Sequence, residues 1–291
     1  MVPGVAMSLV GALITVTTSV NTGLARAAGS LPATLVIHAV GLATISVVLL
    51  MRRQAPSTGK IGPVFFLGGV VGVGTVFSSM FAFAALGASL AVALALLGQT
   101  FFAVVVDATG LLGRRRYPVA VRQAPGIALA IAGVAVMAGA WHGSALALLA
   151  GLVSGALPGL SFILNAELGR ARGVLRSTRV NYITGLAATL VLAAIARPPV
   201  AETARAVLAA GPVLVLGGGL MGVVIVTLVN VLFPRLPAFV ATILLFSGQA
   251  LAGVVIDLTT SGTFDARKVA GVGILLVGLA GNALLSGEAR T

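Results

Sequence analysis

The chain has 291 residues, of which 59% are apolar and only 8% are charged, and its mean hydropathy is +1.15. A soluble domain carries about 25% charged residues, so this composition excludes a soluble enzyme and a disordered or fibrous protein, and lipid must cover most of the surface. The net charge of +12 suits basic loops beside a membrane better than nucleic-acid binding, and the absence of cysteine excludes disulfides and thiolate chemistry.

Apolar runs of about 20 residues, long enough to cross a bilayer, follow one another along the whole chain. The first half holds five, at approximately 4–24, 32–51, 63–85, 88–108 and 124–141. The second half holds five more, at approximately 144–166, 178–196, 212–233, 237–258 and 269–286. The sequence therefore predicts an all-α integral membrane protein with ten transmembrane helices, short loops and no soluble domain.

Lysine and arginine are divided unevenly between the two sides of these predicted spans. The side that also holds both termini collects most of them: Arg52, Arg53, Lys60, Arg114, Arg115, Arg116, Arg122, Arg170, Arg172, Arg176, Arg179, Arg235 and Arg290. The other side holds Arg26, Arg197, Arg205, Arg267 and Lys268. Since cytoplasmic loops carry the excess of positive charge, both termini are predicted to lie in the cytoplasm of a prokaryotic cell.

The two halves of the chain repeat each other in sequence. Residues 11–44 align with 155–188, and residues 68–107 align with 218–257. Matched polar pairs, which an apolar bias does not explain, are Asn21/Asn165, Arg26/Arg170, Gln99/Gln249 and Asp107/Asp257. Five spans per repeat invert the second copy in the membrane, an architecture typical of secondary transporters. The predicted organisation is a first five-helix repeat at 1–142 and a second, inverted one at 143–291.

The repeated motif is a recognisable pattern. The first half carries Asn21-x-x-Leu24-x-Arg26-x-x-Gly29, Gly41, Gly68-Gly69-x-x-Gly72 and Gly98-Gln99 to Asp107. The second half carries Asn165-x-x-Leu168-x-Arg170-x-x-Gly173, Gly185, Gly218-Gly219-x-x-Gly222 and Gly248-Gln249 to Asp257. In this order the residues resemble the YdcZ-type branch of the drug/metabolite transporter (DMT) superfamily, in a fused ten-helix form. The resemblance implies an inner-membrane transporter of small organic molecules and names no substrate.

Polar side chains are costly inside a bilayer, so each one in a predicted span is a functional candidate, with interhelical hydrogen bonding as the alternative. Gln99 and Gln249 lie near the middle of the fourth and ninth spans. They are the predicted substrate-binding pair, because an amide offers donors and an acceptor to a neutral or zwitterionic ligand. The other residues predicted to line the cavity are Asn230, Phe77, Phe81, Phe101 and Phe246.

Other residues are candidates for coupling or gating. Asp107 and Asp257 are either gates or proton sites, or they form salt bridges with nearby bases; Glu167 either titrates as a coupling group or pairs with Arg170 or Arg172. Four more candidates, for which helix capping or hydrogen bonding between helices is the alternative, are Asn21, Asn165, His38 and Tyr182. Pro158 predicts a kink in the sixth span, where closely packed glycines are the alternative reading.

The function predicted from the sequence is alternating-access transport of a small organic metabolite or drug-like molecule. The expected partners are that substrate, membrane lipid and a coupling proton or ion, and the expected state is a monomer or homodimer. The alternatives are a non-transporting membrane scaffold and a flippase-like or scramblase-like protein that handles lipid. Without a Walker A sequence, a hydrolase arrangement or a cluster of metal ligands, we expect no enzyme activity, cofactor, metal or nucleic-acid partner.

Overall fold

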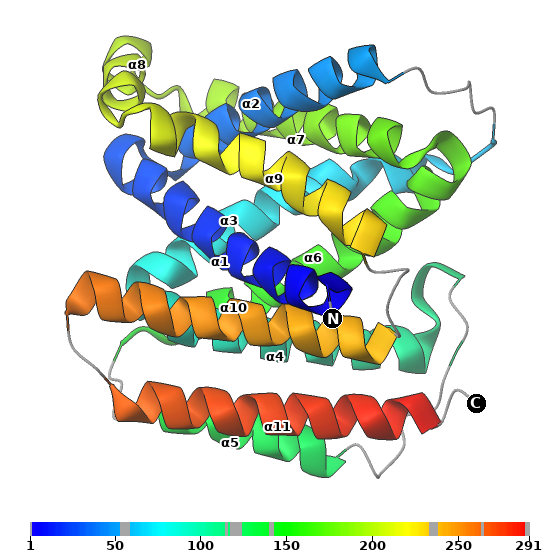
Figure 1. The fold of residues 1–291 in the computed structure, drawn as a ribbon. Coiled ribbons are helices and arrows are strands. Elements are labelled where there is room, and N and C mark those ends of the chain that lie inside the picture. The colour runs from blue at the N-terminus through cyan, green and yellow to red at the C-terminus, as the bar shows by residue number, and fades with distance from the viewer. Residues whose placement is uncertain are drawn as a thin grey trace. The chain divides into compact units, whose positions relative to one another are not determined.

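The computed structural model describes residues 2–52, 59–113, 116, 124–139, 143–232, 238–262 and 265–288, and within these ranges the chain is helical without strands (Figure 1). The α-helices are α1 (Val2–Ala28), α2 (Ser30–Met51), α3 (Gly68–Leu86), α4 (Ala88–Thr109), α5 (Ala124–Ala138), α6 (Ala145–Arg172), α7 (Val174–Ala196), α8 (Val200–Ala209), α9 (Pro212–Leu232), α10 (Ala238–Ser261) and α11 (Ala266–Glu288). Two short 3₁₀ turns, η1 (Pro63–Leu67) and η2 (Leu111–Gly113), complete the described secondary structure.

Eight of the ten predicted spans are confirmed as helices long and apolar enough to cross a membrane. They are Gly4–Ala28, Ser30–Met51, Pro63–Leu86, Ala88–Thr109, Ala145–Arg172, Val174–Ala196, Pro212–Val229 and Ile243–Ser261. The fifth predicted span, 124–141, corresponds to α5, whose 15 residues are shorter than the roughly 20 that a perpendicular crossing needs. The tenth corresponds to α11, which begins with Arg267 and Lys268 in its first turn. Its membrane crossing, and that of α5, stay predictions.

Single glycines join several consecutive helices. Gly29 links α1 to α2 with a φ of 89°, and Gly173 links α6 to α7 with a φ of 88°. Residues that carry a Cβ rarely adopt a positive φ, so glycine permits a one-residue connection between two long helices. These are the glycines that end the repeated Asn-x-x-Leu-x-Arg-x-x-Gly motif, which therefore marks the same tight turn in both repeats.

The segment between α7 and α9 differs from the expectation. Residues 197–211 lie between two predicted spans and are expected to form a loop, whereas the structure has the helix α8 over Val200–Ala209. Pro199 precedes this helix, and Gly211, with a φ of 84°, follows it. The apolar stripe of a ten-residue helix is much shorter than a membrane span, so apolar length along the sequence does not reveal this helix.

The chain forms two compact units, and each takes elements from both repeats. Unit 1 consists of Met1–Val16, Ala82–Ala156 and Val231–Thr291, and unit 2 consists of Thr17–Phe81 and Leu157–Asn230. Unit 1 therefore holds the fourth and fifth helices of both repeats, and unit 2 holds the second helices and most of the third helices α3 and α9. The helices α1 and α6 contribute their first halves to unit 1 and their second halves to unit 2.

In unit 1, α5 lies along α11 and α4 lies along α10 (Figure 1). A Cβ added at Gly133 of α5 would lie 2.5 Å from the Leu275 nitrogen of α11, so the two backbones nearly touch. Small residues allow the helices to approach this closely. In a bilayer the lipid is as apolar as the protein interior, so helices associate through such close packing and not through the hydrophobic effect. Buried Leu94, Leu96 and Leu275 fill the centre of this unit.

In unit 2, α2 and α7 form the central pair (Figure 1). The helix α3 packs on α7 at Gly69, where an added Cβ would lie 2.6 Å from the Gly185 nitrogen. The helix α9 packs on α2 at the equivalent Gly219, where an added Cβ would lie 2.7 Å from the Gly41 nitrogen. The third helix of each repeat therefore contacts the second helix of the other repeat.

Candidate functional site

The fourth helix of each repeat packs closely against the first helix of the other repeat within unit 1. A Cβ added at Gly98 of α4 would overlap the Leu152 carbonyl of α6, and one added at Gly248 of α10 would overlap the Ser8 carbonyl of α1. Because these glycines precede Gln99 and Gln249, the two close contacts fix the helices that carry the predicted substrate-binding pair.

Gln99 and Gln249 occupy equivalent, half-buried positions on α4 and α10, which pack against each other in unit 1. The Thr15 hydroxyl donates to the backbone carbonyl of Gln249 over 3.1 Å. Neither side-chain amide has a hydrogen-bond partner among the described residues. Each amide thus keeps its donors and acceptor available, which is the property a polar ligand needs.

The other residues predicted to line the cavity lie in different surroundings. Phe101 follows Gln99 on α4 and is 38% exposed, whereas Phe246 on α10 is only 6% exposed and belongs to the apolar core of unit 1. In unit 2, Phe81 on α3 is 44% exposed and Phe77 is half-buried. Asn230 lies on α9, but its side chain is outside the part of the chain that the structure describes.

Asn21 and Asn165 lie inside α1 and α6, well before the last residue of either helix, so neither caps a helix end. A Cβ added at Gly218 of α9 would overlap Asn21 Oδ1, and one added at Gly68 of α3 would overlap Asn165 Oδ1. Both oxygens are buried and accept no conventional hydrogen bond. Asn165 Nδ2 donates to Asn181 Oδ1 over 2.9 Å and to Ser161 Oγ over 3.1 Å, tying α6 to α7.

His38 and Tyr182, which the sequence matches only as equivalent positions, lie next to each other in unit 2. Their ring centroids are 6.1 Å apart, and the ring planes meet at 71°. Each ring occupies the place of a missing Cβ, since His38 packs on Gly185 of α7 and Tyr182 packs on Gly41 of α2. His38 Nδ1 donates to the Thr34 carbonyl over 2.8 Å, which leaves Nε2 on the other side of the ring.

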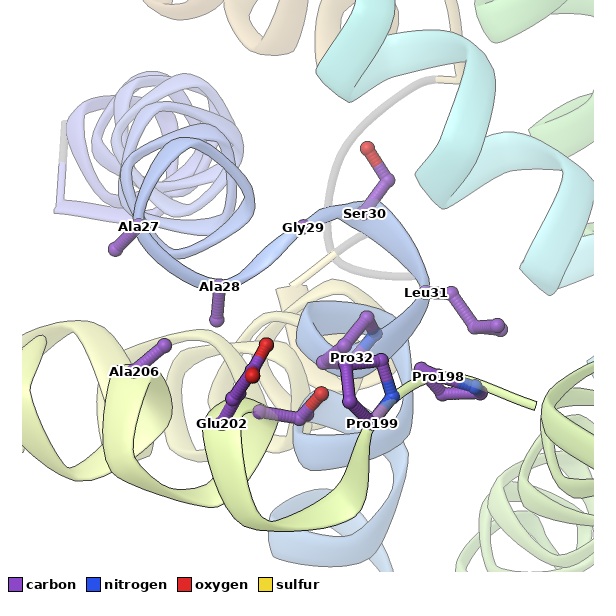
Figure 2. Close-up of a pocket in the computed structure, with 11 residues that line it drawn as sticks. Ala27, Ala28, Gly29, Ser30, Leu31, Pro32, Pro198, Pro199, Glu202 and Ala206 are labelled. Atoms are coloured by element: carbon purple, nitrogen blue, oxygen red, sulfur yellow. The ribbon is translucent and has the colours of Figure 1, made fainter. Parts of the chain in front are cut away.

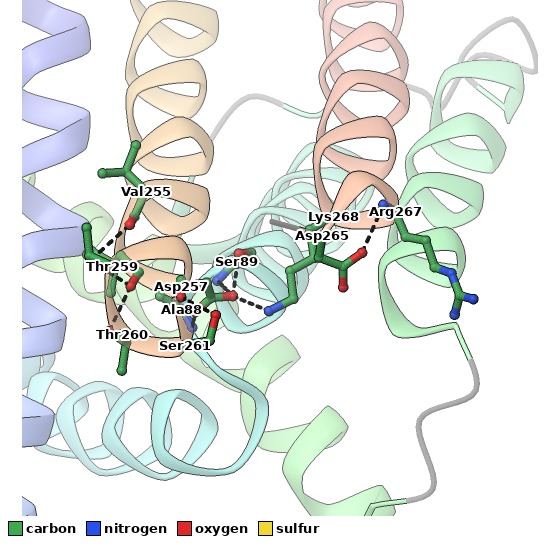
Figure 3. Close-up of polar contacts among 11 residues, drawn as sticks. Ala88, Ser89, Val255, Asp257, Thr259, Thr260, Ser261, Asp265, Arg267 and Lys268 are labelled. Carbon is green, nitrogen blue, oxygen red and sulfur yellow. Dashed lines mark hydrogen bonds and ion pairs between the residues drawn. The ribbon is translucent and has the colours of Figure 1, made fainter. Parts of the chain in front are cut away.

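Asp257 connects three helices of unit 1 (Figure 3). Its Oδ1 accepts the Ala88 backbone N–H over 2.7 Å, and its Oδ2 accepts the Ser89 backbone N–H over 3.2 Å and the Ser89 hydroxyl over 2.5 Å. Lys268 Nζ of α11 donates to the same Oδ2 over 2.6 Å. The carboxylate on α10 thus accepts hydrogen bonds from two backbone N–H groups in the first turn of α4, which have no partner within their own helix. It also pairs with the ammonium group of Lys268 on α11.

The other two acids predicted to take part in coupling or gating, Glu167 and Asp107, lie apart from Asp257 in sequence. Glu167 on α6 forms an ion pair with Arg170, one of the two partners that its position suggests. Asp107 is half-buried near the end of α4, whose Thr109 carbonyl accepts Arg116 Nε over 2.8 Å. No group of three potential metal-ligating side chains occurs in the described ranges. Pro158 stands in α6, which runs as one helix on both sides of it.

A pocket of about 420 Å³ that the sequence analysis does not anticipate lies in unit 2 (Figure 2). The turn between α1 and α2 forms one wall, and Pro198, Pro199 and α8 form the other. Its polar lining residues are Ser30, Glu202 and Thr203. None of the predicted site residues lines it, and the only sequence signal for it was the pair of prolines before an amphipathic segment.

Comparison with known proteins places this geometry in a family. Residues 2–136 and again 146–281 match the family described as "Putative inner membrane exporter, YdcZ", within the drug/metabolite transporters. A solved structure described as "Crystal structure of protein" is 18% identical, covers 100% of this chain and 98% of its own, and superposes with a TM-score of 0.55, which shows a shared fold. A search of curated proteins finds no match. The chain therefore belongs to the YdcZ family of inner-membrane transport proteins, as a multi-pass form with two copies of the family unit.

Proposed function

We propose that this protein is a secondary transporter that exports a small organic molecule across the inner membrane by alternating access. The observation that carries the proposal is the pairing of equivalent contacts between the repeats. Asn21 packs on Gly218 as Asn165 packs on Gly68, and Gly98 approaches α6 as Gly248 approaches α1. Two related halves that contact each other in equivalent ways can exchange their roles, which is how inverted-repeat transporters open first to one side and then to the other.

The arginines support an orientation with both termini in the cytoplasm. The region of the α6–α7 turn carries Arg170, Arg172, Arg176 and Arg179, whereas the equivalent α1–α2 region carries Arg26 alone. By the positive-inside rule, the α6–α7 turn faces the cytoplasm and the α1–α2 turn faces outward. Equivalent turns on opposite sides are what an inverted repeat requires. Because the chain lacks cysteine, single-cysteine variants and a membrane-impermeant thiol reagent on intact cells check this orientation.

Gln99 and Gln249 are the proposed ligand-binding pair. Support comes from their equivalence, from their position on neighbouring helices of unit 1 and from side-chain amides that are unpaired among the described residues. These groups suit a neutral or zwitterionic ligand, with Phe101, two residues after Gln99 on the same helix, as the candidate for its apolar part. Coupling to a proton would fall to Glu167, Asp107 or Asp257, the acids on helices α6, α4 and α10.

Ligand-dependent thermal stability tests the proposed site. Purified protein is heated with a panel of metabolites, drugs and phospholipids, beside Gln99→Ala, Gln249→Ala and the control Thr100→Ala. Thr100 neighbours Gln99, and its hydroxyl donates only to the Leu96 carbonyl of its own helix, over 2.8 Å. A ligand that binds the folded state raises the unfolding temperature by mass action. We expect a small organic class to do so with wild type and Thr100→Ala, and not with either glutamine variant.

Two outcomes would contradict the proposal in different ways. A stabilising shift that survives both glutamine substitutions places the ligand elsewhere in the protein. A shift produced by phospholipids alone favours the lipid-handling function. Flux of the stabilising compound into vesicles containing the protein then separates a transporter from a binding scaffold.

A further inference from the structure

The helix α8 must lie at a membrane surface. It connects α7 to α9, and both of these are helices long and apolar enough to cross the bilayer. Ten residues of α-helix extend about 15 Å, which is half of the roughly 30 Å hydrocarbon thickness. Pro199 before α8 and the positive φ of Gly211 after it set this helix off from both neighbouring spans.

The helix has two different faces. At 100° per residue, Val200, Ala204 and Leu208 form one apolar stripe about 80° wide. Val200 is 81% exposed and Leu208 is 79% exposed. The opposite face, with Glu202, Thr203 and Ala206, lines the pocket against the α1–α2 turn (Figure 2). The apolar stripe therefore points away from the part of unit 2 on which α8 rests.

Exposed charged residues occur on this helix and at the ends of the helices α1 and α7. Glu202 and Arg205 of α8 are exposed, as are Arg26 near the end of α1 and Arg197 at the end of α7. Valine and leucine side chains are more stable in contact with lipid than with water, so an exposed apolar stripe favours a position against the bilayer. A short helix with an apolar stripe and flanking arginines is typical of helices that lie in the membrane surface.

We propose that α8 lies flat in the membrane surface, with Val200, Ala204 and Leu208 inserted at the boundary between phospholipid headgroups and acyl chains. Arg26, Arg197 and Arg205 supply the positive charge that faces lipid phosphates. Its other face lines the pocket together with Gly29–Pro32, which brings the α1–α2 turn close to the same surface. This inference depends on membrane insertion of the chain and not on transport.

Single spin labels test the depth of each face. Val200→Cys, Leu208→Cys and Arg205→Cys are labelled separately, because the native chain offers no competing thiol. The variants are reconstituted in vesicles of phosphatidylethanolamine and phosphatidylglycerol. Collision rates are then measured with oxygen, which concentrates in lipid, and with a water-soluble nickel complex. Val191→Cys on α7, at a position 60% exposed within a span, gives the reference for lipid contact.

We expect the ratio of oxygen to nickel accessibility to be several-fold higher at residues 200 and 208 than at 205, and to approach that at 191. A ratio at 208 equal to that at 205 would show that water covers the stripe and would overturn the proposal. Low accessibility to both reagents at 200 and 208 would show that a second protein copy covers it, which also overturns the proposal. Each labelled position answers separately, so the loss of one variant leaves the test intact.

Discussion

At the scale of single residues, the repeated asparagines and glycines act as pairs. Asn21 packs on Gly218, and Asn165 packs on Gly68, with each oxygen where a Cβ would stand. Neither oxygen has a hydrogen-bond partner among the described residues, and each occupies space that the side chain of any other residue would fill. The motif therefore carries Asn in one helix because it carries Gly in another.

Alanine at these glycines should destabilise the protein. In Gly218→Ala and Gly68→Ala the new methyl group displaces an asparagine side chain, and such overpacking costs about 1–3 kcal/mol. Gly72→Ala is the matched control, since no atom lies within 4 Å of its added Cβ and alanine favours a helix. Thermal unfolding in detergent should rank Gly218→Ala and Gly68→Ala well below Gly72→Ala. Equal losses at all three positions would contradict the Asn–Gly pairing.

Asp257 should matter more as a cap for α4 than as the ion-pair partner of Lys268. Asp257→Ala leaves the N–H groups of Ala88 and Ser89 without their acceptor, and a lost N-cap costs about 0.5–2 kcal/mol. Lys268→Met removes one of the groups that donate to the carboxylate and should cost less. Thr260→Ala, at an exposed hydroxyl bonded within its own helix, is the control for unfolding temperature. A larger loss in Lys268→Met would reverse this order.

At the scale of elements, long helices are joined by very short connections, and the helices end at glycines with a positive φ or at prolines. Gly29 and Gly173 each turn the chain within one residue, and Pro198–Pro199 lie between the end of α7 and the start of α8. By contrast, α6 continues through Pro158, next to the boundary at which the helix passes from unit 1 to unit 2. The proline removes the N–H that would bond the Ser154 carbonyl, so this is where α6 bends most easily.

Replacing that proline should stiffen α6. Pro158→Ala restores the backbone hydrogen bond and removes a defect worth up to about 3 kcal/mol in a soluble helix, so the unfolding temperature should rise. If bending of α6 is part of the transport cycle, flux should fall in the same variant. Pro63→Ala is the control, because Pro63 begins η1, where no helical hydrogen bond is lost. An unchanged unfolding temperature would show that neighbouring groups already compensate for the proline.

At the scale of the whole molecule, the two sequence repeats are interleaved. Each compact unit contains helices of both, and the close glycine contacts join one repeat to the other: α5 to α11, α4 to α6, α10 to α1, α3 to α7 and α9 to α2. Neither repeat supplies all the partners of its own helices. Stability is therefore a property of the fused chain, as expected when small residues provide the packing between helices.

Cutting the chain between the repeats tests this interleaving. We expect residues 1–142 or 143–291, expressed alone, to give no stable monomer, because α5 loses α11 and α4 loses α10. Co-expressed halves should copurify as one folded complex, measured by size-exclusion chromatography and thermal unfolding. A stable, monodisperse monomer of either half would contradict the interleaved packing.

The candidate site was only partly accessible to sequence reasoning. The repeat identified Gln99/Gln249, Asn21/Asn165 and His38/Tyr182 as equivalent pairs, because residue identity and spacing are visible in a single chain. The repeat did not show that the ring centroids of His38 and Tyr182 lie 6.1 Å apart, or that each asparagine packs on a glycine of the other repeat. Those contacts depend on which helix faces meet, and nearly every face of these helices is apolar enough to face a neighbour or lipid.

The membrane class, the duplication, the family pattern and eight spans could be predicted from the sequence, since apolar length and repeated residues are local properties of the chain. The interleaving of the repeats, the capping of α4 by Asp257 from 169 residues away and the helix α8 between two spans became visible only in the folded chain. The physical reason is that lipid-facing and buried side chains are equally apolar, so composition does not mark the contact face. Close packing at glycines marks it, and that packing exists only when distant helices come together.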